Sequence, residues 1–281
     1  MELNSEIVTD PPRDASTVVL LRDSPQGLQV LMMQRHNASQ VLGGVHVFPG
    51  GKLDDDDMSA ALLQWLQEDT HTLHRLLQEP TLEATRAAGL YVAALRELHE
   101  EAGILLGSLH QTATPSESWH ETVSKLDHKL KATLLVPWSR WITPRQPSVT
   151  NKRFDTRFFL AHASAQEEGR HNHEATEMRW LTPNEALHAY WDRQIELAPP
   201  QIMSLAQLRH FSDAQSAMAD ARQRPPALVE PEAHDIQGER MICYPGDPMH
   251  SVRTAAFAGP TRLYFRNKRF EPEGGLAALL V

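Results

Sequence analysis

The alternation of apolar and polar residues predicts that the chain begins with a β-hairpin. Thr17–Leu21 and Leu28–Gln34 are runs of β-branched, Leu or Met side chains on either side of an Asp-Ser-Pro-Gln-Gly turn, a pattern typical of paired strands. Val45–Phe48 has the same character and predicts a third strand. We therefore expect a sheet from about residue 17, preceded by a polar arm of residues 1–16.

A helical period replaces the strand pattern in the next part of the chain. Leu82–Leu105 carries apolar residues at steps of three and four, which make one stripe that should face a core: Tyr91, Leu95, Leu98, Ala102 and Leu105. Met58–Gln67 and Leu73–Gln78 are also apolar at helical spacing, with Trp65 directed inward. Residues 58–80 are thus predicted to form a helical segment of their own.

Strand and helix patterns mix in the second half of the chain. A helix is predicted at Glu117–Leu130, and Thr182 and Pro183 form a helix start of the kind that leads into a helix through Arg193. Strands are predicted at Ala132–Val136, Arg153–His162 and Glu177–Leu181, and a last helix at Pro199–Phe211. Strands mixed with helices that cover both faces of a sheet predict an α/β/α sandwich around a mixed sheet.

The chain becomes Pro-rich after Arg222, which suggests a domain over residues 17–222 followed by a C-terminal extension, residues 223–281. Arg240–Tyr244 and Thr261–Phe265 are candidate strands in this extension. Three roles remain open for it: it completes the sheet, covers the mouth of a site, or pairs two subunits as a homodimer.

Composition narrows the class of protein. A chain of 281 residues with a formal net charge of −9 argues against nucleic-acid binding, which requires a basic face. One cysteine, Cys243, cannot form an internal disulfide, which is consistent with a reducing cytoplasm. The N-terminus has no signal-peptide pattern, and no apolar run reaches the roughly 18 residues of a membrane span. We expect a cytoplasmic protein that does not enter a membrane.

Three acidic residues share one face of the predicted helix. At about 100° per residue, Glu97, Glu100 and Glu101 lie together beside the apolar stripe. Like charges at these spacings destabilise a helix by a few tenths of a kcal/mol per pair, roughly. A hard divalent cation such as Mg²⁺ removes that conflict and keeps room for substrate phosphates. The alternative is a solvated acidic helix face without a metal.

A turn with two glycines, upstream of the acidic face, is suited to lie against a metal–phosphate site. Val47–Asp54 is a short apolar run interrupted by Pro-Gly-Gly, and paired glycines permit the close approach that a loop against a metal–phosphate site needs. The acidic run Asp54–Asp57 that follows is better explained as a helix start than as a metal site, because carboxylates favour the positive end of a helix.

Together these two segments resemble the signature of Nudix hydrolases. The matching residues are Phe48–Gly51 and Arg96–Ile104, the latter reading Arg-Glu-Leu-His-Glu-Glu-Ala-Gly-Ile. The family pattern expects a Glu six residues after Gly51, where this chain has Asp57, and it expects a short spacer where this chain has Met58–Leu95. A long insertion at this point resembles the coenzyme A diphosphatase-like branch.

Further stretches resemble the same branch, and the likeness extends from about Thr17 to Phe211. The coenzyme A signature is matched by Arg35, Gly44 and Phe48–Gly51, while His36 and Gln40 stand where a small residue and a second Arg are expected. The other stretches that look like this branch are Trp138–Pro144 with Arg153–Phe159, and Leu197–Gln201.

The resemblance implies a Nudix α/β/α sandwich with a helical insertion inside the Nudix box and a metal-dependent diphosphatase activity. The implied reaction splits a nucleoside diphosphate linked to another moiety, with coenzyme A or acyl-coenzyme A as the first expectation. Mg²⁺ or Mn²⁺ would be held by Glu97, Glu100, Glu101 and the Gly50 carbonyl. Arg96 would orient the carboxylates through an i, i+4 pair with Glu100. The proton of the attacking water would go to Glu97 or to a loop carboxylate, Glu174 or Glu177.

The remaining predictions concern substrate contacts. Arg35, Gly51, Arg153 and Arg157 are expected to bind the substrate, because the Arg fork matches phosphate oxygens. The basic residues of the tail, Arg262, Arg266, Lys268 and Arg269, are candidate phosphate contacts in the same way, and surface solubility is the alternative for both clusters. Residues 58–80 are expected to form a cap that shapes the substrate mouth. His171, His173 and Glu174 suggest zinc, although a polar loop explains them more simply. ADP-ribose or NADH are alternative substrates, and a non-catalytic Nudix-like binding module is the alternative from another class.

Overall fold

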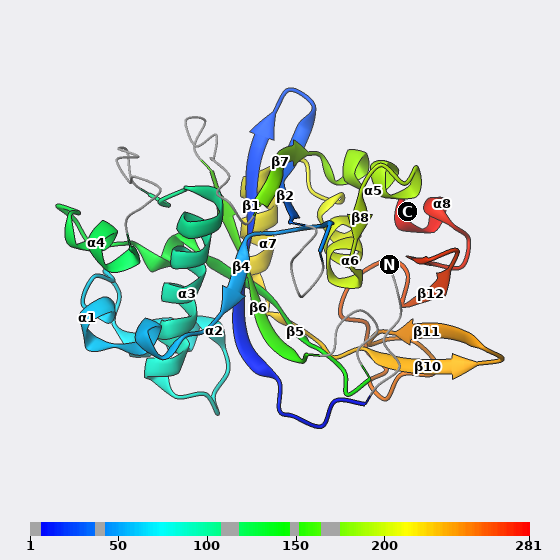
Figure 1. The fold of residues 1–281 in the computed structure, drawn as a ribbon, viewed down its shortest axis with the longest axis horizontal. Coiled ribbons are helices and arrows are strands. Elements are labelled where there is room, and N and C mark those ends of the chain that lie inside the picture. Colours follow the sequence, from blue (N-terminus) through cyan, green and yellow to red (C-terminus); the bar gives the residue numbers. More distant parts are fainter. Residues whose placement is uncertain (1–6, 37–42, 108–117, 147–151, 164–174) are drawn as a thin grey trace.

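A mixed sheet between two layers of helices forms the body of the protein, as Figure 1 shows for the computed structural model. The structure describes residues 7–36, 43–107, 118–146, 152–163 and 175–281. Within these ranges the sheet has nine strands in the order β8-β3-β2-β1-β6-β5-β9, with β4 beside β1 and β7 beside β2. Its strands are β1 (Arg13–Ser24), β2 (Gly27–Arg35), β3 (Val45–Val47), β4 (Gly50–Lys52), β5 (Val136–Ile142), β6 (Phe154–His162), β7 (Ala175–Leu181), β8 (Glu196–Leu197) and β9 (Ala227–Val229). The predicted α/β sandwich is confirmed.

The N-terminal hairpin organises the sheet. β1 and β2 pair antiparallel around the turn, with Leu21 opposite Val30. β1 also runs parallel to β6, and this pairing starts at Arg13 opposite Phe154, inside the segment expected to be a polar arm. The strand begins earlier than its apolar pattern suggests because the neighbouring strand supplies partners for its backbone groups.

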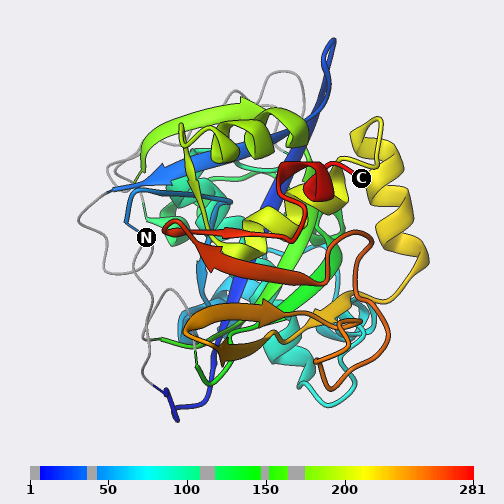
Figure 2. The ribbon, with the colours of Figure 1, turned by 90° about the vertical axis from the view of Figure 1, so that its right-hand side faces the viewer.

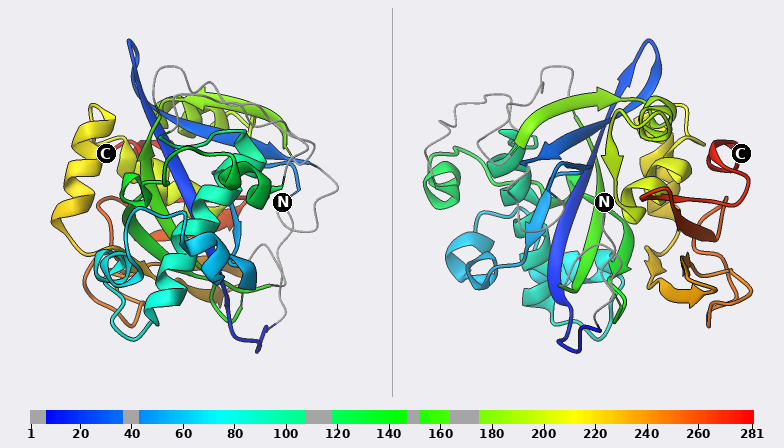
Figure 3. Two further views of the ribbon diagram at one scale, coloured as in Figure 1. Left: turned by 90° about the vertical axis from the view of Figure 1, so that its left-hand side faces the viewer. Right: turned by 45° about the vertical axis from the view of Figure 1, so that its right-hand side comes forward.

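The insertion is helical but does not form a separate cap. It contains the 3-10 turn η1 (Asp55–Met58) and the helices α1 (Ala60–Leu63) and α2 (Thr70–Leu77), which lie beside α3 (Ala84–Ala102), as Figure 3 shows. Its buried leucines belong to the same apolar cluster as Tyr91 and Leu95 of α3: Leu62, Leu66, Leu73 and Leu77. The apolar face of the insertion therefore fills the core on this side of the sheet, and its predicted role in shaping the substrate mouth stays a prediction.

An ion-pair network fastens the insertion to the sheet. The carboxylate of Glu79, just after α2, lies 2.9 Å from Arg140 of β5 and 2.6 Å from Arg157 of β6. Asp155 pairs with Arg140 at 2.6 Å, and Asp14 of β1 pairs with Arg157. Arg157 is buried and Arg140 is partly exposed, and each has carboxylate partners that compensate its charge.

The segment between α3 and β5 differs from its pattern. The predicted helix 117–130 is present only as α4 (Trp119–Ser124), and the predicted strand Ala132–Val136 is instead the 3-10 turn η2 (Ala132–Leu134), with β5 starting at Val136. The carboxylate of Glu68 accepts the backbone N–H groups of Ala132 and Thr133 at 2.9 and 3.3 Å, which holds a turn there. The insertion thus decides the local structure of a distant segment.

Helices α5 (Pro183–Trp191) and α6 (Pro199–Leu208) cover the opposite face of the sheet. Thr182 caps α5 as predicted, in a reciprocal pair with Glu185. The prediction that α6 is the last helix was wrong, because α7 (Ala214–Gln223) follows with Asp213 as its cap. In the described parts of the chain, no helix combines the length and apolar character needed to cross a membrane.

The C-terminal extension adds to the body of the protein. Its first strand, β9, pairs parallel with β5 and extends the central sheet. β10 (Glu232–Ile236), β11 (Glu239–Cys243), β12 (Arg262–Arg266) and β13 (Arg269–Glu271) form a second sheet, which Figure 2 shows with α8 (Leu276–Leu279). The Tyr190 hydroxyl of α5 donates to the carbonyl of Phe270 at 2.8 Å, and both rings belong to the core that contains α6.

Candidate active site

The glycine turn lies directly against the acidic end of α3. The backbone N–H of Gly50 donates to Glu101 Oε2 at 2.8 Å. A Cβ atom on Gly51 would come within 2.2 Å of Glu97 Oε1, and one on Gly50 within 2.4 Å of the Ser16 carbonyl oxygen. Gly50 therefore requires glycine for its close approach to the backbone, and a side chain at position 51 would have to displace the Glu97 carboxylate. The two segments that carry the Nudix resemblance meet in space.

Arg96 connects the carboxylates of this site. Its NH1 atom donates to Glu97 Oε1 at 2.8 Å and to Glu100 Oε2 at 2.9 Å, which confirms the predicted i, i+4 pair. Burial lowers the pKa of Arg96, but hydrogen bonds to Asp57 and the nearby negative charges outweigh it and raise the pKa above its ordinary value. Arg96 consequently stays charged and holds two acidic side chains in fixed positions.

Asp57 is the residue that holds Arg96. It is buried, and its two carboxylate oxygens accept from Arg96 Nε at 2.8 Å and NH2 at 3.0 Å. Oδ2 also accepts the backbone N–H of Asp54 at 2.9 Å, in the capping box that begins η1. The acidic run is thus a helix start, as predicted, and Asp57 also positions the Arg of the Nudix box.

The three glutamates of α3 differ in environment. The side chains of Glu97 and Glu101 are 15% and 6% exposed against the glycine turn, whereas that of Glu100 is 41% exposed. Burial raises the pKa of Glu97, and the charge of Arg96 opposes that shift. One carboxylate is consequently a better proton acceptor than an ordinary Glu, because desolvation strengthens its basicity.

The carboxylate oxygens at this site are suitable ligands for a hard divalent cation, but they are not already arranged around a metal position. No three His, Cys, Asp or Glu side chains of the described residues are arranged to hold a metal ion. Ion pairs at this site link five carboxylates to the guanidinium groups of Arg35 and Arg96, which leaves an excess of three negative charges. Oxygen donors with excess negative charge suit Mg²⁺ or Mn²⁺, and such an ion would compete with Arg96 for Glu97 and Glu100.

Of the other predicted site residues, the structure brings Arg35 to the carboxylates. Arg35 NH1 lies 3.6 Å from Glu101 Oε1. Glu177 lies on β7 with a side chain 51% exposed, and its Oε2 is 4.0 Å from His46 Nε2. Its role as a base stays a prediction. Glu174, Gln40 and the two histidines of the zinc alternative lie outside the described residues.

Arg153 and Arg157 do not fit their predicted role as substrate ligands. Arg157 is 3% exposed, and its guanidinium is occupied by Glu79, Asp14 and Asp155. Arg153 is also buried, and its Nε donates to the carbonyl of Thr143 at 2.9 Å. A guanidinium that is buried and already bonded cannot reach a phosphate from solution. The tail arginines 262, 266 and 269 likewise pair with acidic neighbours.

The residue pattern did not identify one buried polar side chain, that of His46 on β3. Neither ring nitrogen has a hydrogen-bond partner among the described residues. Burial lowers its pKa, although the charge of Glu177 acts in the opposite direction. The signal available in the sequence was a polar residue inside an otherwise apolar strand.

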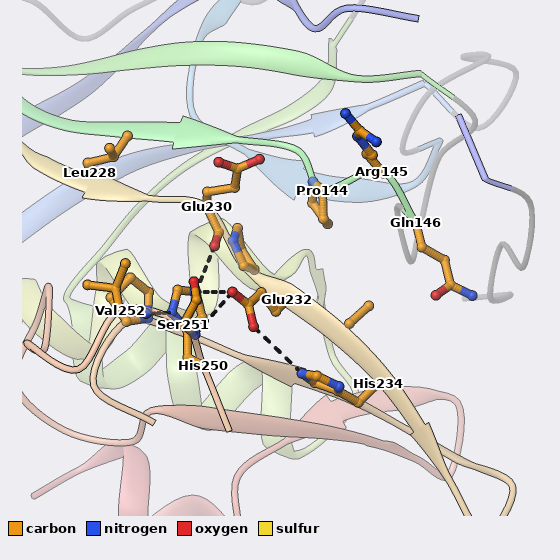
Figure 4. Close-up of a pocket in the computed structure, with 13 residues that line it drawn as sticks. Pro144, Arg145, Gln146, Leu228, Glu230, Glu232, His234, His250, Ser251 and Val252 are labelled. Atoms are coloured by element: carbon orange, nitrogen blue, oxygen red, sulfur yellow. Dashed lines mark hydrogen bonds and ion pairs between the residues drawn. The ribbon is translucent and has the colours of Figure 1, made fainter. Parts of the chain in front are cut away.

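A separate hollow of about 550 Å³ lies in the C-terminal part, shown in Figure 4, with a lining that includes no residue of α3 or β4. Its buried His250 accepts the N–H of Val252 at Nδ1 and donates from Nε2 to the carbonyl of Glu230, both at 2.9 Å. Since both ring nitrogens are used, this histidine holds the loop together.

Glu97→Gln is expected to raise the thermal midpoint at about pH 7 in the presence of a chelator, and to change it little at about pH 4. Burial raises the pKa of Glu97 in the folded protein, so the folded state binds its proton more tightly than the unfolded chain. The wild type therefore loses stability as the pH rises through that pKa, and glutamine does not. Calorimetry across this range measures the difference.

Glu100→Gln is the control for that experiment, because the Glu100 side chain is 41% exposed. The change in thermal midpoint that it causes should not grow with pH in the same way. A lower midpoint for Glu97→Gln at neutral pH would show that the pair with Arg96 outweighs the burial of the carboxylate.

Known proteins resemble the chain in both sequence and fold. A family model described as the NUDT19 Nudix domain matches residues 12–208. The acyl-coenzyme A diphosphatase NUDT19 of Xenopus laevis is 28% identical over 236 residues, 66% of this chain and 60% of its own length. The human protein of that name is 26% identical over 235 residues, 66% of this chain and 62% of its own.

One solved structure is similar over most of the fold, a Nudix hydrolase from Alicyclobacillus acidocaldarius. It is 25% identical, with a TM-score of 0.57, over 75% of this chain and 97% of the other. This chain spans about 60% of the length of the frog and human relatives.

Proposed function

This chain belongs to the NUDT19 Nudix domain family, and we propose that it is a diphosphatase that hydrolyses coenzyme A or an acyl-coenzyme A. The products would be 3′,5′-ADP and 4′-phosphopantetheine or its acyl derivative. The names of the frog and human relatives support this substrate class, as does the match of Arg35, Gly44 and Phe48–Gly51 to the coenzyme A signature.

The observation that carries the proposal is the meeting of that signature with the acidic helix. Gly50 donates to Glu101, Gly51 leaves space for the Glu97 carboxylate, and Arg35 lies 3.6 Å from Glu101. A cation beside these carboxylates would attract the diphosphate, and the guanidinium of Arg35 would attract a phosphate group of the same substrate. One place on the protein thus combines the groups that bind the substrate with those that act on it.

Glu97, Glu100, Glu101 and the Gly50 carbonyl would hold Mg²⁺ or Mn²⁺, which when bound lowers the pKa of water and neutralises phosphoryl oxygens. Asp57 and Arg96 fix Glu97 and Glu100 before substrate arrives. Glu97 would accept the proton of the attacking water at its carboxylate, since burial raises its pKa above the ordinary value. Glu174 or Glu177 would serve as the alternative base.

Coenzyme A should exceed dephospho-coenzyme A in kcat/KM by at least about tenfold, because a charge-assisted contact to the 3′-phosphate contributes roughly 1.5–3 kcal/mol. Arg35 is the expected partner, since the arginines 153, 157, 262, 266 and 269 are engaged within the protein. Steady-state kinetics with Mg²⁺ and with Mn²⁺, on a panel that adds ADP-ribose and NADH, measures this preference.

Arg35→Gln should reduce the difference between the two coenzymes. A tenfold advantage of ADP-ribose over coenzyme A would overturn the proposed substrate and leave diphosphatase chemistry in place. No turnover of any compound with either metal would favour a Nudix-like binding module.

A further inference from the structure

Part of the central sheet is accessible on the face that points away from α3. Ser16 of β1 points towards α3, because its hydroxyl donates to the carbonyl of Leu90 at 2.7 Å. Side chains alternate along a strand, so Ala15 and Thr17 point to the other face. Thr17 is partly exposed there, and so is Thr156 of the neighbouring strand β6. β1 and β6 are inner strands of the sheet, so solvent reaches its interior part from this side.

Four side chains that can donate hydrogen bonds surround Ala15 on this face. Ala15 pairs with Lys52 of β4 on one side and with Thr156 of β6 on the other, so all three side chains point the same way. Arg13 and Thr17 lie two residues before and after Ala15 on β1 and therefore share its face. Ala15 has only a methyl group, so it forms the floor of a donor cluster made of Arg13, Thr17, Lys52 and Thr156.

None of these four side chains is engaged within the part of the chain that the structure describes. Arg13 and Lys52 are exposed, and neither has an ion-pair partner among the described residues. The hydroxyls of Thr17 and Thr156 likewise have no hydrogen-bond partner in the described ranges. Two cations and two hydroxyls are thus available to a ligand in one small area.

The carboxylates that neighbour these cations in the sequence are engaged on the α3 side. Asp14 follows Arg13 and pairs with Arg157, and Asp54 lies 3.7 Å from Arg96. These carboxylates therefore do not neutralise the positive charge of the donor cluster.

The donor cluster lies beside the glycine turn of the candidate active site. A Cβ atom on Gly50 would come within 2.6 Å of Thr17 Oγ1, whereas one on Gly51 would meet Glu97. The carboxylates and the donor cluster therefore lie on opposite sides of β4. This strand has three residues and pairs only with β1 among the described strands, as Figure 1 shows. A substrate held at the carboxylates is thus one short strand away from the donor cluster.

We propose that the donor cluster is an anion site that binds a phosphate group. Arginine and lysine pair with phosphate through charge and N–H donors, and threonine hydroxyls donate to its remaining oxygens. Neighbouring strands are about 4.8 Å apart, so Lys52 and Thr156 flank a gap of roughly 10 Å over Ala15, which their side chains and one phosphate can span. The phosphate comes either from the substrate, as its 3′-phosphate, or from free phosphate ion. The first source rests on the proposed function, and the second does not.

The double variant Arg13→Gln with Lys52→Gln tests the site. Its matched control is Lys129→Gln with Arg222→Gln, which removes the same charge from exposed positions that also have no side-chain partner among the described residues. Calorimetry with inorganic phosphate, in the presence of a chelator, should show binding at least about tenfold weaker in the double variant and unchanged in the control. Thr156→Val keeps the net charge and loses one hydroxyl, so it should weaken binding about threefold.

The two sources of phosphate are distinguished by the ratio of kcat/KM for coenzyme A to that for dephospho-coenzyme A. A tenfold fall of this ratio in the double variant, with the control unchanged, assigns the 3′-phosphate to the donor cluster. An unchanged ratio together with weakened binding of inorganic phosphate assigns the cluster to the free ion.

The site would be overturned if the wild type binds no inorganic phosphate and the double variant keeps the wild-type ratio. Equal losses in the double variant and its control, or unchanged binding by Thr156→Val, would also overturn it, because long-range charge alone would then explain the effect. If the binding results hold but no diphosphate is hydrolysed, the proposed activity fails and the anion site stands.

Discussion

Glu101→Gln and Glu100→Gln should each lower turnover by at least about 10²-fold and leave the fold intact. A glutamine at position 101 can still accept the N–H of Gly50, so the glycine turn keeps its contact with α3. What it loses is negative charge at the place where a divalent cation would bind. Glu100 is 41% exposed and pairs with Arg96 at the surface, so its removal disturbs little packing.

Turnover of the best substrate and the thermal midpoint are to be measured for both variants under saturating metal. Glu83→Gln is the control, because Glu83 precedes the same helix at its far end and makes no capping hydrogen bond through its side chain. Near wild-type rates in both Glu100→Gln and Glu101→Gln would remove the acidic helix from the mechanism. A large fall in midpoint would instead assign the lost activity to unfolding.

The parts of this site that could be predicted from the sequence are those encoded locally. The apolar stripe from Tyr91 to Ala102 fixes which face of α3 is buried, and the same spacing places the acidic residues beside it. The glycines of the turn indicate a close approach without naming the partner. The structure supplies the partner, the carboxylate of Glu97 against Gly51.

The contacts that could not be predicted join residues far apart in the chain. Asp57 and Arg96 are separated by the insertion, and Glu79 meets Arg140 and Arg157 of distant strands. An Arg on a strand has the same local pattern whether it binds a phosphate or a buried carboxylate, which is why Arg157 was misassigned. Its structural role follows from the positions of Glu79, Asp14 and Asp155 around its guanidinium.

The insertion and the segment that it contacts also show which features of helices and strands could not be predicted from the sequence. Its apolar spacing predicts helices correctly, but the surface that those helices cover depends on the packing of Leu62 and Leu73 against α3. The turn at Ala132 depends on Glu68 in the same way, since a strand-like apolar run is bent by a carboxylate from another segment. Tertiary contacts therefore overrode local propensity at both places.

Asp57→Ala should lower the free energy of unfolding by about 3 kcal/mol, because it removes the buried partner of a buried charge. Asp57 is 1% exposed, and both of its carboxylate oxygens hold Arg96. Arg96 retains Glu97, Glu100 and the Lys52 carbonyl, so the effect should fall at the lower end of the range for a broken buried pair. Chemical denaturation measures the free energy directly.

The same substitution should also reduce turnover, since Arg96 released from Asp57 is free to pair more closely with Glu97 and Glu100 and would compete with a metal for them. Asp57→Asn helps to separate the two effects, because it keeps the side-chain volume and one carbonyl acceptor for Arg96, and loses the charge and the second acceptor. We expect it to be destabilised less than Asp57→Ala, while its need for metal, measured as the Mg²⁺ concentration at half-maximal rate, rises. If both variants are destabilised but keep the wild-type metal requirement, Asp57 serves the fold alone and does not position the carboxylates through Arg96.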